Sequence, residues 1–567
     1  MQVPNTSRQT LTLLDFQKAE KLAEAGAAYR DGRAQRPRLA LINFADDFAI
    51  GTRSIAATVR QAGYCCELLF LKRLPHNSPH YRLNEANYAA TLALLRRIQP
   101  DVIGLSVATR VLPWAIELSR RIRAAFPDVC LLWGGWHATM SPDSVFREVE
   151  VDGVAVGEGE ATMLEVLDRI GKGLSLANIA GLHTAIGDTV GQRPLVQNLD
   201  ALPWFRYDEQ PSWLIEDAGV TTFDGLPPHY GPDRYGYPLI TSRGCPYNCS
   251  FCSVPYLKDL YATTEGRFLR RRSVDSVIEE LVYARDRLGA NYVWFFDEEF
   301  LFHRKWIREF LPRYRDRVGL PWYCEAHPDS FLDESFVRLL SGSGLVDLEI
   351  GIQSASPATL ALFNRPLRTR DQLVDLTRVF ADTRIAVTYD VILDNPLETG
   401  ADVRQTLEFL LSLTRPFTVQ MFTLAFRENY PLTRKALEAG AITRADYEAT
   451  VLLDQLGEEP GGEQDFRRKA KIGEFPFVQL SFLNCLVYLT QVDGFPRSWI
   501  RAMSHSRWWE QRANWLGWLV LVLERSRLAH VRFLLRRRRV REVAARARHI
   551  ALEQGSAALR ESGAGPE

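Results

Sequence analysis

The chain has 567 residues, 46% of them hydrophobic, so it is long enough for several domains with packed cores and too apolar to be disordered. Basic and acidic side chains number 69 each, and this balance excludes a strong overall field for nucleic acid or an acidic membrane. No segment reaches the roughly 20 continuous apolar residues of a membrane span, and residues 1–20 lack the apolar block of a signal peptide. We therefore expect a cytoplasmic protein of several domains.

The first domain is expected over residues 38–185, after an N-terminal extension of residues 1–37. Short β-rich runs alternate there with amphipathic helical stretches, and these runs read LALINF, CCELLFL, DVIGLSVA, VCLLWGG and VDGVAVG. The alternation predicts an α/β, doubly wound Rossmann-like domain, whose parallel sheet is covered by helices on both faces. Ligands of such domains bind beyond the carboxyl ends of the strands, where polar and Gly-rich turns lie in this sequence.

Three further regions follow. Residues 186–235 are rich in Pro, Gly and Tyr without sustained periodicity, which is typical of a linker. Six strand candidates alternate with helical stretches over residues 236–453 and predict a partial (β/α)6 barrel of the TIM type. Residues 454–567 favour a mostly helical C-terminal domain, with five of the thirteen Trp between Trp499 and Trp518.

Three of the eight Cys lie directly after the first strand of the expected barrel, in ITSRGCPYNCSFCSVPYL. They are Cys245, Cys249 and Cys252, and a C-x3-C-x2-C triplet has a chance expectation of roughly 0.002 at this length and Cys content. Structural zinc takes four ligands, and this loop holds no fourth Cys or His. Three thiolates suit a four-iron cluster with one iron open, to which the amino and carboxylate groups of S-adenosylmethionine (SAM) can bind.

With Phe251 before the last Cys, this loop resembles the signature of the radical SAM superfamily. The resemblance implies that Cys245, Cys249 and Cys252 hold a [4Fe-4S] cluster and that the region of Phe251 packs against the adenine of SAM. A zinc knuckle or a plain electron-transfer cluster is the alternative. The other five Cys are scattered, and we interpret them as buried free thiols.

Other strand ends of the barrel resemble SAM-contact motifs of the same superfamily. Asp297 and Glu298 follow the second strand, where the resemblance implies a contact to the SAM amino group; a cap of the next helix is the alternative. Gln353 stands where the family more often has Glu, so a neutral group replaces a charged contact. Asp390, in VTYDVIL, resembles the fifth-strand motif. No side chain is assigned as general base.

The first domain resembles cobalamin-binding domains of the methionine synthase type, which carry D-x-H-x-x-G after their first strand. Asp46, Phe48 and Gly51 keep that spacing, but Phe48 replaces the His that ligates cobalt. A bound corrinoid therefore either lacks a nitrogen ligand from the protein on its lower face or receives one from another residue. His137 is the candidate for that ligand, but we favour a role for His137 in shaping its own loop. The remaining landmarks follow the third, fourth and fifth strands: Ser106, Thr109, Gly134, Gly135, Gly157, Glu158 and Gly159. The alternative for Phe48 is a core aromatic in a domain that binds nothing.

Together, residues 38–450 resemble the cobalamin-dependent radical SAM enzymes. The resemblance implies a [4Fe-4S] cluster, SAM and cobalamin, and a methyltransferase that modifies an unactivated carbon of a small, natural-product type substrate through a 5'-deoxyadenosyl radical and methylcobalamin. It also implies an external electron donor of the flavodoxin or ferredoxin type. One alternative is an oxidative cyclase or ring-rearranging enzyme with the same cofactors, and the other is a corrinoid-binding sensor with a structural cluster.

The C-terminal helices allow two interpretations. A lid over the barrel mouth would bury the Trp residues and shape a substrate pocket, and we favour it because only residues 516–523 are continuously apolar. A membrane-surface helix would instead place Trp at the interface and Arg near lipid head groups. Nucleic acid is not expected as a partner, because one Arg run without a recognition fold is weak support for it.

Overall fold

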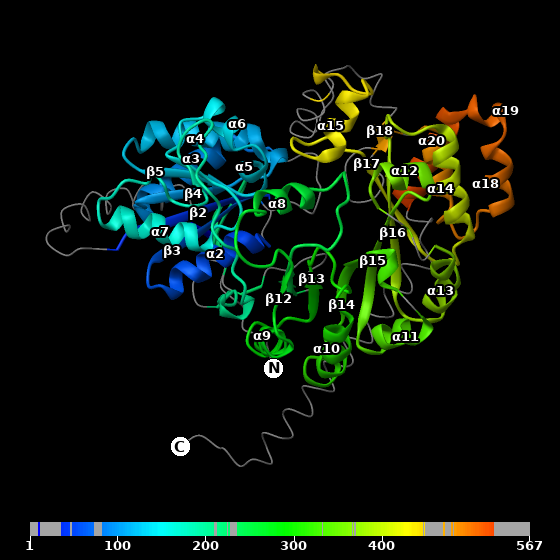
Figure 1. The fold of residues 1–567 in the computed structure, drawn as a ribbon, viewed down its shortest axis with the longest axis horizontal. Helices are drawn as coiled ribbons and strands as arrows, with labels where there is room; N and C mark the ends of the chain where they lie inside the picture. The colour runs from blue at the N-terminus through cyan, green and yellow to red at the C-terminus, as the bar shows by residue number, and fades with distance from the viewer. Residues whose placement is uncertain are drawn as a thin grey trace, which may run out of the picture.

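Two parallel sheets form the framework of the chain, and Figure 1 shows the first domain on the left and the barrel to its right. The computed structural model describes residues 10–11, 36–45, 48–72, 82–208, 212–223, 225–226, 235–331, 333–365, 367, 370–445, 447, 469–470, 478–479 and 481–526. Most of the N-terminal extension lies outside these residues, as does the Arg run of residues 536–539.

The first sheet has the strand order β1-β9-β8-β3-β2-β4-β5-β6-β7. Its parallel centre consists of β2 (Arg38–Phe44), β3 (Cys65–Leu71), β4 (Val102–Ser106), β5 (Cys130–Gly134) and β6 (Gly153–Ala155). Helices α2 (Ile50–Gln61) and α7 (Glu160–Gly171) cover one face. The other face carries α3 (Glu85–Ile98), α4 (Leu112–Ala125), α5 (Trp136–Met140) and α6 (Pro142–Glu148). The doubly wound prediction is confirmed, and β2 and β4 flank the point where the strand order reverses.

The structure differs from the linker expected over residues 186–235. It places β8 (Ser212–Glu216) in parallel beside β3, and β9 (Gly219–Phe223) returns antiparallel to β8. Two short edge strands complete the sheet, β1 (Thr10–Leu11) beside β9 and β7 (Leu182–His183) beside β6. The β8–β9 strands are only five residues long and lie between Pro- and Gly-rich stretches, so their pattern is too brief to stand out.

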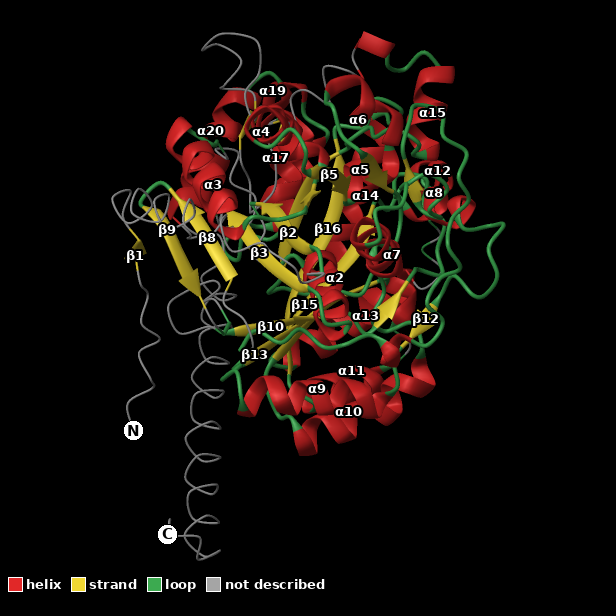
Figure 2. Cartoon of the chain, turned by 90° about the vertical axis from the view of Figure 1, so that its left-hand side faces the viewer, coloured by secondary structure: helices red, strands yellow, loops and turns green. Residues whose placement is uncertain are grey.

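The second sheet is the expected six-stranded barrel, with all neighbours parallel and in sequence order. Its strands are β10 (Gly236–Leu239), β13 (Tyr292–Phe295), β14 (Trp322–Ala326), β15 (Leu345–Gln353), β16 (Ala386–Leu393) and β17 (Thr418–Thr423). The connections carry α8 (Val254–Leu260), α9 (Val274–Asp286), α10 (Arg304–Arg317), α11 (Glu334–Gly342), α12 (Pro357–Leu362), α13 (Arg370–Asp382), α14 (Gly400–Ser412) and α15 (Pro431–Glu438). Helices α9, α10 and α11 pack side by side outside the barrel (Figure 2).

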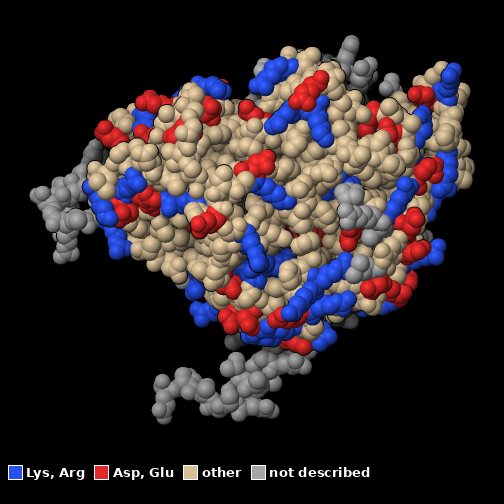
Figure 3. Space-filling view, viewed as in Figure 1, with Lys and Arg blue, Asp and Glu red and all other residues tan. Residues whose placement is uncertain are grey.

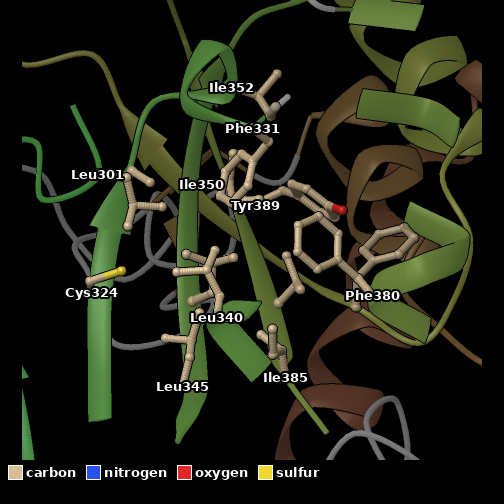
Figure 4. Packing of buried hydrophobic residues seen from close by; sticks show 14 of the residues in the cluster. Leu301, Cys324, Phe331, Leu340, Leu345, Ile350, Ile352, Phe380, Ile385 and Tyr389 are labelled. Atoms are coloured by element: carbon tan, nitrogen blue, oxygen red, sulfur yellow. The ribbon is translucent and has the colours of Figure 1, made fainter. Parts of the chain in front are cut away.

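Strand alternation separates the barrel's outer core from its lumen. Alternate residues of each strand pack outward under the helices, and Figure 4 shows Phe331, Phe380 and Tyr389 gathered in that core. The inward residues of β14, β15 and β16 include Tyr323, Glu325, Glu349 and Asp390. Polar caps set several helix starts: Ser273 accepts a hydrogen bond from Ser276 N before α9, and Asp333 accepts one from Phe336 N before α11.

The described C-terminal helices, which end at Ser526, pack on the barrel but do not form the predicted lid. They are α17 (Phe482–Leu489), α18 (Arg497–Ser504), α19 (Arg507–Glu510) and α20 (Ala513–Ser526), and a short hairpin of β18 (Lys469–Ala470) and β19 (Val478–Gln479) precedes them. The lid prediction is wrong because α17 supplies the buried apolar face, while four of the five Trp remain more than half exposed. Figure 1 places α18 and α19 on the opposite side of the barrel from the first domain.

Buried ion pairs join the first domain to the barrel. Strand β11 (Ser242–Arg243) pairs with β12 (Arg270–Arg271). One Arg side chain from each strand forms ion pairs with acidic residues at the start of α7. Arg243 donates to Glu160 at 2.6 Å and lies 3.1 Å from Glu158, which also accepts a 2.6 Å bond from Arg270. Although burial opposes ionisation of Glu160, Arg243 holds the pKa of this carboxyl below its usual value. The two domains are thereby fixed relative to each other.

We expect Arg243→Gln to destabilise the protein by roughly 3–5 kcal/mol, because it leaves the buried Glu160 carboxylate without its cation. The measurement is denaturant unfolding of the anaerobically purified protein, combined with limited proteolysis across residues 186–211. Arg313→Gln is the matched control: Arg313 pairs with Asp275 and Glu309 at the surface, and such pairs contribute about 1 kcal/mol or less. An Arg243→Gln protein as stable as the control would contradict the docking role.

Candidate active site between the two domains

The cysteine loop follows β11 and starts with a tight turn. Gly244 has φ +91°, and a Cβ there would lie 2.8 Å from the Phe268 carbonyl oxygen, so the turn requires glycine. Cys245 and Cys249 are buried, Cys252 is partly buried, and none forms a disulfide. The loop therefore presents three free thiols at the end of the first barrel strand, where the sequence predicts them.

Neighbouring segments hold the backbone of this loop in place. The Lys258 ammonium group donates to the carbonyl oxygen of Tyr247 at 2.9 Å and to Asn248 Oδ1 at 2.6 Å. From the turn after α12, Asn364 Nδ2 donates to the carbonyl oxygen of Asn248 at 2.9 Å. These bonds fix the loop from two sides, so its thiols are positioned before any ligand arrives.

The electrostatics of the loop favour a metal cluster over free thiolates. Burial raises the pKa of Cys245 to about 12 and also raises that of Cys252, so these thiols keep their protons until a cation compensates the charge. Arg365 Nη1 lies 3.2 Å from Cys249 Sγ. Among the described residues, no three potential ligands surround one point suitable for a single metal ion. A cube-shaped [4Fe-4S] cluster needs no such point, because each thiolate bonds a different iron, and the donor set fits it.

The structure separates the roles of Asp297 and Glu298. Asp297 accepts hydrogen bonds from the Thr241 backbone and hydroxyl groups at 3.0 and 2.7 Å, and from the Ser242 hydroxyl. This buried carboxylate thus holds β10 against β13. Glu298 instead lines the cavity between the domains, and burial raises its pKa to about 7. Of the two predicted SAM contacts, only Glu298 faces open space.

Phe251 belongs to the cysteine loop, and Gln353 lies near it. Phe251 packs edge-on against Phe363 at 4.9 Å between ring centroids, beside the turn that holds the loop. Gln353 ends β15 in the left-handed region at φ +64°, next to Arg365, whose guanidinium donates to the Gly351 carbonyl oxygen at 2.6 Å. A β-bulge between Gly351 and Gln353 produces this arrangement.

Asp390 belongs to a group of carboxyls in the barrel lumen. Glu325 and Glu349 lie opposite each other on β14 and β15, and the Tyr323 hydroxyl lies between them, 3.1 Å from Glu325 Oε1 and 2.8 Å from Glu349 Oε2. Burial and the neighbouring Glu349 raise the pKa of Glu325 to about 8 and raise that of Asp390 strongly. Asp390 Oδ1 is buried without a hydrogen-bond partner. The lumen therefore disfavours the charged form of these carboxyl groups, and Glu325 keeps its proton near neutral pH.

A cavity of about 790 Å³ lies where the strand ends of the first domain face the barrel. From the barrel side, Gly244 and Glu298 reach it, so it adjoins the cysteine loop. Its other end enters the first domain between the sheet and helices α2 and α7, where Leu41, Gly104 and Met163 line it. Apolar side chains with a few polar groups among them make a lining of the kind that cofactor sites have.

Most of the residues predicted for cobalamin line this cavity: Phe48, Gly51, Ser106, Gly134, Gly135, Gly157, Glu158 and Gly159. Asp46 lies outside the described residues. Thr109 is not part of the lining and instead lies 3.3 Å from His137 Nδ1. The Glu158 carboxylate is engaged by Arg243 and Arg270, so its main contribution is to domain docking. A Cβ at Gly51 would meet nothing within 4 Å, which marks open space at that position.

No imidazole reaches the cavity from the described residues. Phe48, which replaces the expected His, packs against Trp294 and Phe296 of the barrel at 5.2 and 5.4 Å between ring centroids. Both ring nitrogens of His137 are engaged, by Thr109 and by the Ser144 hydroxyl at 3.0 Å, and burial lowers the pKa of His137 to about 4. His137 thus shapes its loop, and Phe48 joins the two domains while it borders the cavity.

Several site residues escape sequence reasoning. Arg365 beside Cys249 and Tyr261, whose hydroxyl accepts a 2.8 Å hydrogen bond from Glu158 N, come from segments without a recognisable motif. Trp204 and Phe205 line the cavity from the expected linker. The aromatic pair within LPWFRY was the available signal, since aromatic residues in a loop often cover a pocket.

Family comparisons agree with this arrangement. A B12-binding domain model matches residues 43–167, and a radical SAM superfamily model matches residues 239–410. An uncharacterized methyltransferase, PH0819 of Pyrococcus horikoshii, is 28% identical over 60% of this chain and 70% of its own length. The anaerobic magnesium-protoporphyrin IX monomethyl ester cyclase of Rubrivivax gelatinosus is 24% identical over 60% of this chain, which spans 59% of the cyclase.

Solved structures show the same architecture. The radical SAM methyltransferase TsrM from Kitasatospora setae, with tryptophan and a SAM analogue bound, superposes with a TM-score of 0.55 over 71% of this chain and 76% of TsrM. Its 18% identity makes this a likeness of fold. The domain order, the free cysteine triplet and the cavity between the domains lead to one assignment: the chain belongs to the cobalamin-dependent radical SAM enzymes.

Proposed function

We propose that this enzyme is a methyltransferase that transfers a methyl group from cobalamin to an unactivated carbon of a small, natural-product type molecule. The observation that carries the proposal is the shared cavity, because the cysteine loop and the Gly-lined strand ends open onto the same space. PH0819 and TsrM are named as methyltransferases, which supports methyl transfer over cyclisation. We place the enzyme in the cytoplasm, with a flavodoxin- or ferredoxin-type electron donor.

Separate sets of residues would bind the cluster and SAM. Cys245, Cys249 and Cys252 would hold the [4Fe-4S] cluster, and Arg365 compensates thiolate charge beside Cys249. Glu298, Gln353 and Asp390 are the SAM contacts that the geometry supports best. When bound, the cluster supplies the electron that cleaves SAM, and cobalamin supplies the methyl group. The protein orients both and excludes water, since the cavity lies between two packed domains.

The barrel lumen is the proposed space for SAM and substrate. Glu325 retains accessible surface there although strands surround it, so it borders a space that a ligand can enter. Its raised pKa makes it a hydrogen-bond donor near neutral pH. Phe296 and Tyr323 add aromatic surface on the same side, which suits a substrate with an apolar body.

Changing Cys249 to Ser should abolish radical chemistry. With dithionite and SAM under anaerobic conditions, we expect the wild type to release 5'-deoxyadenosine and the variant to release at least about 100-fold less, because the cluster loses one of three anchors. Iron content should fall in parallel. The exposed Cys65→Ser is the matched control. Retained turnover in the Cys249 variant would refute the assignment, and formation of S-adenosylhomocysteine in the wild type separates methyl transfer from cyclisation.

Filling the cavity at Gly51 should expel cobalamin without unfolding the protein. Gly51 is helical with open space around it, so Gly51→Leu places four carbons in the cavity region and fits helix geometry. We expect at least a tenfold loss of hydroxocobalamin affinity in visible absorption titrations. Gly342→Leu, also helical and unobstructed but far from the cavity, should bind as the wild type does. Equal affinity in both variants would contradict the assignment.

Protonation of Glu325 should appear in the pH dependence of stability. Its pKa is about 8 in the folded protein and about 4.5 when unfolded, so only the unfolded chain loses this proton as pH rises through that window. Folding stability therefore falls between about pH 4.5 and 8. Glu325→Gln should raise the melting temperature at pH 8 by roughly 2–4 °C, allowing for solvent access, and leave it unchanged at pH 5. The surface variant Glu334→Gln should show no such pH dependence.

A further inference from the structure

Helices α18, α19 and α20 present an unusual exposed aromatic surface, which we call the Trp face. Its members are Trp499, Trp508, Trp515, Trp518 and Val522. The four Trp side chains are 52–64% exposed, and together with Val522 they are half of the ten exposed large hydrophobic residues among those the structure describes. Isolated exposed apolar residues need no explanation, but a cluster on consecutive helices indicates a contact surface.

Helix α20 shows why the Trp face is not ordinary packing. Leu516 and Val520 lie on its inner side and are completely buried in the barrel's outer core. Trp515, Trp518 and Val522 follow at intervals of three and four residues, so they share one outward stripe. A surface helix of a soluble domain normally turns polar residues outward, and α20 is apolar on both sides. The described side chains of its outer side are therefore available for contact with a partner.

The net positive charge of residues 497–548 indicates an anionic partner. Between residues 497 and 548 the sequence has fourteen Arg, three Glu and neither Lys nor Asp, although the whole chain is neutral. Within the described part, the Arg512 guanidinium lies 3.6 Å from the Trp508 ring centroid, so cationic and aromatic groups are already combined. Figure 3 shows both basic and acidic side chains on the face that it displays, with basic side chains gathered below its centre. Trp and Arg together match the head-group region of an anionic bilayer.

We propose that the Trp face docks this enzyme on the surface of an anionic membrane. Helix α20 has 14 residues, about 21 Å at the usual helical rise, and no helix within the described ranges is long and apolar enough to cross a bilayer. The helices therefore lie in the interface, with the Trp side chains at head-group depth and Arg512, which stacks on Trp508, near the phosphates. Since α18 and α19 lie on the opposite side of the barrel from the first domain, docking leaves the cavity between the domains unobstructed (Figure 1).

Vesicle binding by the full chain tests this proposal. Cosedimentation should show at least tenfold tighter binding to vesicles of phosphatidylcholine with 30% phosphatidylserine than to pure phosphatidylcholine, and 0.5 M salt should weaken it. Trp fluorescence should shift to shorter wavelength on binding. The double variant Trp515→Gln, Trp518→Gln should bind at least about tenfold more weakly, and its exposed positions leave the fold intact.

The control is Leu174→Gln with Ile186→Gln, two similarly exposed apolar residues of the first domain. It should bind vesicles as the wild type does. Equal binding of the Trp double variant overturns the proposal, as does no binding by the wild type. A vesicle-free dimer that depends on Trp515 and Trp518 would assign the face to a second copy and also overturn it. SAM cleavage is measured in parallel and should be unchanged, so this proposal fails independently of the proposed reaction.

Discussion

The ion pairs of Arg243 are the constraint on which the active-site geometry depends. Arg243 lies two residues before Cys245, and it reaches across the domain boundary to Glu158 in the loop after β6 and to Glu160, the first residue of α7. Because these charges are largely buried, any shift between the domains would leave one of them uncompensated, at a cost of several kcal/mol. The same short backbone segment thus fixes the cysteine loop and the strand ends of the first domain. A rigid connection between the domains keeps the distance between a cofactor bound by the barrel and one bound by the first domain constant.

Phe48, which stands in place of the expected His, also helps to hold the two domains together. A His in that loop would face the cavity as a cobalt ligand, whereas Phe48 contacts Trp294 and Phe296 in the barrel. These aromatic contacts add apolar area to an interface that is otherwise held by charges. The chain therefore uses the position to pack its domains, and the described lining leaves cobalt without an imidazole.

Local sequence patterns predicted the parallel central strands of the first sheet, the six barrel strands and the cysteine triplet, because each depends on neighbours within a few residues. The resemblance to cobalamin-binding domains predicted most of the glycines that line the cavity. The β8–β9 hairpin escaped prediction because its strands are short and their pairing with β3 is remote in sequence. Asp297 and Glu298 are adjacent acidic residues that the sequence does not distinguish. In the structure Asp297 accepts hydrogen bonds from Thr241 and Ser242, whereas Glu298 faces the cavity. Which charged residues meet is set by tertiary structure, and sequence spacing does not encode it.

The Trp-rich helices illustrate how one pattern supports opposite structures. Aromatic residues at helical spacing predict burial, and α17 does bury its apolar face against the barrel. Once that side is covered, α20 has a second apolar stripe with nothing left in the described chain to receive it. The barrel stands between this stripe and the cavity, so the two surfaces share no side chains. Attachment at the Trp face would then determine the location of the enzyme, while the buried ion pairs and the cysteine loop determine its reaction.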